Sequence, residues 1–241
     1  MKKTLIASFI LLSSMANADA VFTDQSISYL QGSDYELGDN ERRVLTYEHF
    51  SVYSWGDVFG FVDRLVNVND GGAETYIELS PNINLVTFDG GLVNSVKLAT
   101  TWEMVSIGDL AFTTTTDDSA DNFLVGIGAG FNVPGFAYVN ANLYHRFNDA
   151  VDDNQQLTIT WGLPFEVAGQ SFMFDGFWDI TNEVDGVSTS NLTPQLKWDI
   201  SKLVGYDGKL YAGVEYVNWT NKLYSDGTDE NNANLLIKAH F

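Results

Sequence analysis

Hydrophobic and polar residues alternate one by one along much of this chain. The clearest stretch runs from Asn122 to Phe131, where apolar side chains occupy every second position and small or polar ones lie between them. This period of two places the apolar residues on one face of a β-strand. Residues Asn132 to Gly135 form a turn signal, and the alternation resumes from Ala137 to Tyr144. The sequence therefore predicts a hairpin with one apolar and one polar face.

The same period predicts about twelve strands along the chain. Most have the roughly 9 to 11 residues that a tilted strand needs to cross a bilayer, and an even number is usual in bacterial membrane barrels. We therefore expect an all-β fold, a transmembrane antiparallel up-and-down β-barrel. Its strands are expected at Gln25–Gln31, Arg43–Tyr53, Val58–Asn67, Thr75–Leu85, Val93–Met104, Asn122–Phe131, Ala137–Tyr144, Gln155–Phe165, Ser171–Asn182, Asn191–Ile200, Lys209–Asn221 and Ala233–Phe241.

The connections between these strands alternate in length. Five are compact, and the six between them are longer and hold 18 of the carboxylates. Short periplasmic turns opposite longer outer loops are typical of such barrels, with both chain ends on the periplasmic side. The acidic loops are compatible with two roles: keeping the surface soluble, or attracting cations and bridging divalent ions to lipopolysaccharide.

A soluble β-sandwich or lipocalin-like barrel is the alternative, because it would turn the same apolar faces inward. Periodicity alone does not separate the two arrangements. Bulky aromatic residues on the apolar face, near strand ends, favour the membrane barrel, where they would form interfacial girdles. They are Trp102, Phe147, Trp161, Phe172, Phe174, Trp178 and Trp198.

The pattern of the N-terminal residues predicts an export signal. Lys2 and Lys3 precede an apolar stretch, and small residues follow at Ala18 and Ala20, so we expect a signal peptide over residues 1–20 and a barrel over residues 21–241. A short membrane anchor is the alternative, but the apolar stretch is well below the roughly 20 residues of a spanning helix. The last strand ends in Phe241, which resembles the assembly signal that the barrel assembly machinery reads in bacterial outer-membrane proteins.

Composition narrows the class further. The chain contains no cysteine, so an exported form must be stabilised by hydrogen bonding and burial, as in a closed barrel. Loss of residues 1–20 would leave 10 basic and 31 acidic residues, a charge that repels nucleic acid. The expected surroundings are outer-membrane lipid and lipopolysaccharide.

If the apolar faces meet lipid, the polar faces line a wet lumen. A lining of mixed charges and aromatic rings would let an amphipathic solute stack on a ring and hydrogen bond nearby. In the alternative, the charges pair with one another and the rings fill a narrow lumen. The expected lining comprises Asp57, Phe59, Phe61, Asp63, Glu78, Asn82, Lys97, Glu103, Tyr138, Asn140, Asn142, Tyr144, Arg146, Asp175, Phe177, Asp179, Gln195, Lys197, Asp199, Tyr211 and Glu215.

Catalytic and metal-binding patterns are weak in this sequence. The three histidines, His49, His145 and His240, do not fall beside an obvious serine and acid at an outward-facing site. There are no paired histidine or cysteine ligands for a metal, and we expect no cofactor. The sequence therefore favours a channel over an outer-membrane protease or lipid hydrolase.

Residues 47–50 (YEHF) followed by residues 55–63 (WGDVFGFVD) form a segment that resembles the Tsx-like family of nucleoside-specific channel-forming outer-membrane proteins, and this is the best match. In the same order come Glu78 to Pro81, then Asn84-Leu85, Val96 to Ala99, and Val125 to Gly128 before a Pro-Gly turn. The chain departs from the family pattern at Asn82, where a basic residue is expected.

The resemblance implies a narrow twelve-stranded barrel through which nucleosides and deoxynucleosides diffuse. The candidate substrate-binding residues are Asp57, Phe59, Phe61, Asp63, Glu78, Tyr138, Tyr144, Arg146, Asp175 and Phe177, the first four being the strongest. A non-selective small porin, and a plugged barrel that serves as a phage or adhesion receptor, remain the alternatives.

Overall fold

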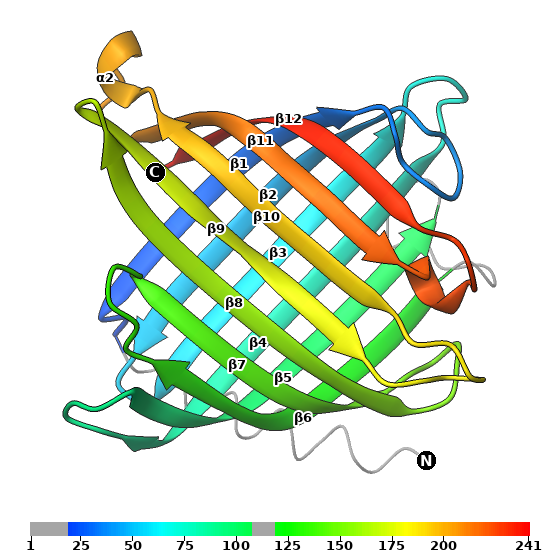
Figure 1. Ribbon diagram of the computed structural model, residues 1–241, viewed down its shortest axis with the longest axis horizontal. Helices are drawn as coiled ribbons and strands as arrows, with labels where there is room; N and C mark the ends of the chain where they lie inside the picture. Colours follow the sequence, from blue (N-terminus) through cyan, green and yellow to red (C-terminus); the bar gives the residue numbers. More distant parts are fainter. Residues whose placement is uncertain (1–18, 108–118) are drawn as a thin grey trace.

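The computed structural model describes residues 19–107 and 119–241, and in them twelve antiparallel strands close into a single barrel. Each strand pairs with its neighbours in sequence, and β1 pairs with β12 to complete the ring (Figure 1). The predicted fold and strand number are confirmed. The strands are β1 (Phe22–Gly32), β2 (Arg42–Tyr53), β3 (Gly56–Asn67), β4 (Ala73–Thr87), β5 (Val93–Ile107), β6 (Ser119–Phe131), β7 (Tyr138–Phe147), β8 (Asn154–Val167), β9 (Gln170–Thr181), β10 (Ser190–Asp199), β11 (Lys209–Thr220) and β12 (Glu230–His240).

Most strands extend further than the sequence pattern indicates. The first strand begins at Phe22 rather than Gln25, because its residues pair in register with β2 as far as Val52. Strand β12 likewise begins at Glu230, which pairs with Trp219 although it belongs to an expected loop. Backbone pairing continues beyond the residues whose side chains alternate. The strand ends were predicted from alternation alone, so the predicted strands are too short.

The two ends of the barrel differ, as predicted. At one end, the turn end, the connections are residues 54–55, 88–92, 132–137, 168–169 and 200–208, the last containing the short helix α2 (Ser201–Val204). At the opposite end, the loop end, lie residues 33–41, 68–72, 148–153, 182–189 and 221–229, including the 3-10 turn η1 (Lys222–Tyr224). Figure 1 shows α2 and the β1–β2 connection at opposite ends of the barrel. The expected signal peptide and the β5–β6 connection lie largely outside the described residues.

The packing of this barrel is inside out compared with a soluble domain. Large apolar side chains point away from the axis, and Leu235 is 72% exposed. The most buried side chains include charged and amide groups that point inward, such as Lys197, Asn232 and Asn234. An apolar outer wall around a polar interior suits hydrocarbon outside and water inside. Among the described residues no helix has the length and apolar character needed to span a bilayer.

Outward-facing aromatic residues gather toward both ends of the wall. Phe165 and Phe172 stack with ring centroids 5.4 Å apart beside the turn end, and Phe123 and Phe147 stack at 6.5 Å toward the loop end. Outward-facing Trp198 also lies at the turn end, one residue before β10 finishes. Aromatic rings at two levels are typical of the two interfaces of a membrane.

Glycines on the inner face of β6 let neighbouring strands approach closely. A Cβ atom on Gly126 would lie 1.8 Å from the carbonyl oxygen of Leu143, and one on Gly128 would lie 2.2 Å from Oδ1 of Asn142. On the same inner face, Tyr144 packs with Leu124 and Ala99 in a small buried cluster. Part of the lumen beside β6 is therefore filled by the wall itself.

Candidate functional site

The aromatic-acidic residues of β3 face the barrel interior, as expected from their spacing. Phe59 and Phe61 lie with ring centroids 5.8 Å apart, and Phe61 is 5.7 Å from Tyr76 on the adjacent strand β4. These three rings form a continuous row, which we call the aromatic row. Asp57 and Asp63 lie on the same inward register at its two ends.

Four lumen-facing cations are each held by a carboxylate. Lys97 Nζ lies 2.5 Å from Asp57, Arg146 lies 2.7 Å from Glu103, and Lys197 lies 2.6 Å from Asp175. The fourth pair joins Lys238 to Glu48. All of these side chains are largely withdrawn from bulk solvent, so the alternative in which lumen charges pair with one another holds for these residues.

Other inward carboxylates have only neutral hydrogen-bond donors beside them in the described part of the chain. Asp63 accepts a hydrogen bond of 2.5 Å from Thr46, and Glu78 accepts one of 2.7 Å from the Tyr76 hydroxyl. Asp179 is bound by Thr158 and Gln156, and Glu215 by Gln195 and Asn234. The lumen therefore carries more acidic than basic groups, and two of its surplus carboxylates, Asp63 and Glu78, border the aromatic row.

The remaining candidate residues also lie on the inward register, with different surroundings. Tyr138 covers Gly162 beside the turn end and is 44% exposed, whereas Tyr144 is buried and accepts a hydrogen bond of 2.9 Å from Asn142. Arg146 bonds Gln156 and Asn148 as well as Glu103. Phe177 pairs with Thr160 on β8. The structure thus brings Asp57, Phe59, Phe61, Asp63 and Glu78 together on β3 and β4, and Arg146 adjoins this group through Glu103, which pairs with Glu78.

The sequence reading missed several lumen residues, among them Tyr76, Glu48 and Lys238. Tyr76 is two positions before Glu78, and strand parity could have placed it in the lining. Glu48 and Lys238 are 190 positions apart, and only closure of β1 against β12 brings them together. No local signal in the sequence indicates that pair.

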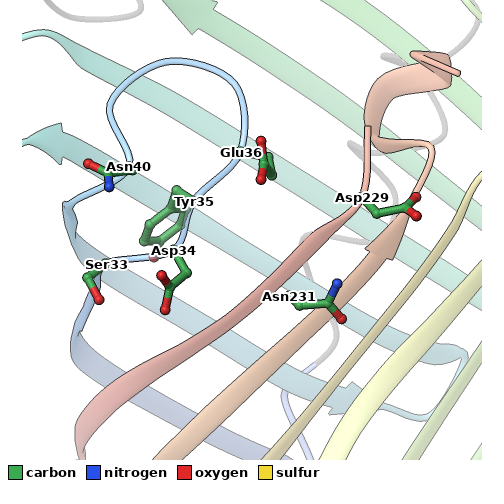
Figure 2. A pocket seen from close by; sticks show the side chains of 7 residues that line it. All are labelled: Ser33, Asp34, Tyr35, Glu36, Asn40, Asp229 and Asn231. Carbon is green, nitrogen blue, oxygen red and sulfur yellow. The ribbon is translucent and has the colours of Figure 1, made fainter. Parts of the chain in front are cut away.

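Hollows lie at both ends of the barrel. One of 410 Å³ at the turn end is bordered by inward-facing residues that include Met173, Asp199 and Tyr211. The other, of 340 Å³ at the loop end, lies between the β1–β2 connection and the start of β12 (Figure 2). Its lining is polar: Ser33, Asp34, Tyr35, Glu36, Asn40, Asp229 and Asn231.

The histidines are divided between the wall and the turn end. His145 points outward and contacts Phe147 edge to face, with ring centroids 4.5 Å apart. His49 lies beside Ser51 on the outer face, opposite to its sequence neighbour Glu48. His240 Nδ1 is 2.8 Å from Asp24 at the turn end. Within residues 19–107 and 119–241 no group of three or more histidine and acidic side chains could hold a metal ion.

Comparison with known proteins gives a family match over most of the chain. The model of the nucleoside-specific channel-forming protein Tsx matches residues 22–230. A search of curated proteins found no match. Among solved structures, the KdgM porin has a TM-score of 0.52 at 12% identity, covering 90% of this chain and 99% of its own. KdgM with disordered oligogalacturonate gives 0.50 at the same identity and coverage, a likeness that shows the fold alone. The inside-out barrel and the family match together show an outer-membrane channel for small solutes, and the chain belongs to the Tsx family of nucleoside-specific channel-forming proteins.

Proposed function

We propose that the aromatic row and the carboxylates beside it form the nucleoside-binding part of this outer-membrane channel. The observation that carries the proposal is the run of contacts Phe59–Phe61–Tyr76, bordered by Asp63 and Glu78, which bond only neutral donors among the described residues. A nucleobase stacks on the rings, and the sugar hydroxyls donate to the carboxylates. Tyr138, Tyr144, Arg146, Asp175 and Phe177 shape the rest of the route.

The strength of such a site suits passive diffusion. Stacking of one base on an aromatic side chain is worth about 1 to 3 kcal/mol in other proteins, which concentrates a solute without trapping it. The same lining acts differently on a charged solute. The surplus of inward carboxylates repels anions, so a nucleoside should pass more readily than its monophosphate.

Current recording in planar bilayers tests this proposal. Adenosine should block the open channel at millimolar or lower concentrations, whereas glucose and adenosine monophosphate should block it far less. Replacing Phe59 and Phe61 by alanine should weaken adenosine blockade severalfold. Phe123→Ala is the matched control, because that ring faces lipid. Equal blockade by all three solutes would favour a non-selective porin, and the absence of current would favour a plugged receptor barrel.

The partners of the channel follow from its location. Lipopolysaccharide around the outer wall and the barrel assembly machinery during insertion are predictions from the barrel and from the aromatic residue Phe241. The family and the fold are those of a channel. We infer that the chain catalyses no reaction, and replacing His49, His145 and His240 in turn, followed by lipid and peptide turnover assays, tests that inference.

A further inference from the structure

Positive charges inside the barrel are all matched, and negative charges are not. Every lysine and arginine that faces inward from the described strands has a carboxylate partner. These cations are Arg42, Lys97, Arg146, Lys197, Lys209 and Lys238. Among the inward carboxylates of the same strands, four have no cation at ion-pair distance and bond only neutral donors. These four, which we call the unpaired carboxylates, are Asp63, Glu78, Asp179 and Glu215.

The paired cations are held in place by further hydrogen bonds. Lys197 Nζ donates a bond of 3.0 Å to Gln195 in addition to its contact with Asp175. Arg146 likewise donates to two amide side chains in addition to its contact with Glu103. A cation that turned toward an unpaired carboxylate would leave its own buried partner without a counter-charge, which is strongly unfavourable. The excess of negative charge in the lumen is therefore fixed.

The unpaired carboxylates lie in the half of the barrel nearer the loop end. Asp63 is four residues before the end of β3, Asp179 two before the end of β9, and Glu215 five before the end of β11. Glu78 is five residues after the start of β4, which begins at the same end. The paired Asp57, in contrast, is the second residue of β3, at the turn end. The excess negative charge is therefore concentrated on one side of the passage.

The hollow at the loop end has the same sign of charge. Its lining contains Asp34, Glu36 and Asp229, and no basic residue is among the described residues that border it (Figure 2). All three of these acidic residues are exposed to solvent. An ion that approaches the loop end therefore passes carboxylates at the mouth before it reaches those inside.

The unpaired carboxylates are distributed around the ring rather than gathered at one point. They come from four strands, β3, β4, β9 and β11. Within residues 19–107 and 119–241 no acidic group is compact enough to hold a metal ion. Separate weak sites of one sign favour the passage of an ion over its capture. The low-dielectric walls of a narrow lumen strengthen the field that these charges produce.

We propose that this channel conducts small monovalent cations in preference to anions, and that the unpaired carboxylates set this preference. Acidic side chains around a lumen select cations in other channels. A hydrated potassium ion is attracted by the excess negative charge and chloride is repelled, because the fixed lumen cations are already neutralised by their partners. The proposal rests on the channel function, and it does not depend on nucleoside binding at the aromatic row.

Reversal potentials in planar bilayers under a KCl gradient test the proposal. The unmodified channel should be more permeable to potassium than to chloride by roughly fivefold or more. The double variant Asp179→Asn/Glu215→Gln removes two negative charges and keeps an acceptor oxygen at each position, so this permeability ratio should fall by about half or more. Asp89→Asn/Asp207→Asn removes two exposed carboxylates at the turn end. This matched control should leave the ratio unchanged.

Adenosine blockade in the same bilayers separates this proposal from the nucleoside site. Asp179 and Glu215 lie on β9 and β11, whereas the aromatic row lies on β3 and β4, so the double variant should be blocked as the unmodified channel is. Cation-selective current without adenosine blockade would contradict the nucleoside site alone.

Three results would overturn the cation preference. They are a non-selective or anion-selective current through the unmodified channel, an unchanged permeability ratio in Asp179→Asn/Glu215→Gln, and an equal fall in Asp89→Asn/Asp207→Asn. Compact migration in detergent gels verifies that each variant is folded. If the double variant does not insert, the single variants Asp179→Asn and Glu215→Gln provide the same test, each with a smaller fall in the ratio.

Discussion

The hydroxyl of Tyr35 donates a hydrogen bond of 2.8 Å to Oδ1 of Asn234, which joins the β1–β2 connection to the inner face of β12. The backbone N–H groups of Asp34 and Glu36 add bonds to Asn232 and Glu230 on the same strand. Tyr35 is buried, and burial raises its pKa above the usual range, so it remains a neutral donor. This loop is therefore tied to the wall at the loop end of the barrel.

Replacing Tyr35 by phenylalanine should loosen the loop without unfolding the barrel. A single neutral hydrogen bond contributes about 1 kcal/mol, which corresponds to roughly a fivefold increase in the opened population. Cleavage at Glu36 by a glutamate-specific protease should accelerate by about that factor. Tyr29→Phe, on the lipid-facing side, is the control and should leave the rate unchanged. An unaltered rate in Tyr35→Phe would mean that the backbone bonds alone hold the loop.

The contact between Asp39 and Asn69 should depend on pH. Hydrogen bonds from the backbone and side-chain N–H groups of Asn69 lower the pKa of Asp39. The carboxylate therefore stabilises the contact fully above the ordinary aspartate pKa, about 3.9, and loses this effect as pH falls through its lower folded value. The Asn69 amide resonance in micelles should titrate below pH 3.9. Asp39→Asn should remove the titration, and a midpoint at or above the ordinary value contradicts the assignment.

Removing the cation from the pair Lys197–Asp175 should destabilise the barrel strongly. Lys197 is almost completely buried, and Oδ1 of Asp175 has no hydrogen-bond partner within the described residues. Lys197→Met leaves an unpaired buried carboxylate, a change that costs about 3 to 5 kcal/mol in other proteins. Denaturant unfolding in micelles measures it. The double variant Lys197→Met/Asp175→Leu should recover most of the loss, while Lys209→Met, 61% exposed, should cost under about 1 kcal/mol.

The close approach at Gly126 predicts a steric effect. Alanine there would place Cβ against the Leu143 carbonyl, which belongs to a paired strand and cannot move freely. Gly126→Ala should cost about 1 to 3 kcal/mol, seen as a lower temperature at which the barrel loses its compact migration in detergent gels. Gly60→Ala is the control, since its nearest neighbour would be at 3.2 Å. Equal behaviour of the two variants would show that β6 and β7 can separate.

Strand alternation was sufficient to predict which side chains face inward. Successive residues of a strand point to opposite faces, so an assignment made at Phe61 extends to Asp57 and Asp63 without knowledge of the fold. The same rule indicates that His49 and Glu48 face opposite sides of the wall, and the structure places Glu48 inside and His49 outside. The family resemblance also rested on this strand, where aromatic and acidic residues share one face.

Partner choice within the lumen could not be obtained from the sequence. Whether Lys97 neutralises Asp57 depends on three strands lying side by side in a particular register, and Glu48 meets Lys238 only after the ring closes. Inward folding of the β1–β2 connection was also invisible, because Tyr35 lies in a loop without periodicity. Contacts between distant segments follow from register and closure, which local pattern does not encode.

Because β12 pairs with β1, the barrel closes only when the last strand has been synthesised. A chain that is truncated before β12 has two unpaired edge strands, β1 and β11. It also lacks the Asn234 acceptor for Tyr35 and the Lys238 partner of Glu48. Such a fragment cannot be a leaky, half-working version of the finished molecule. We expect periplasmic proteases to degrade it, so that truncated chains add no unselective pores to the membrane.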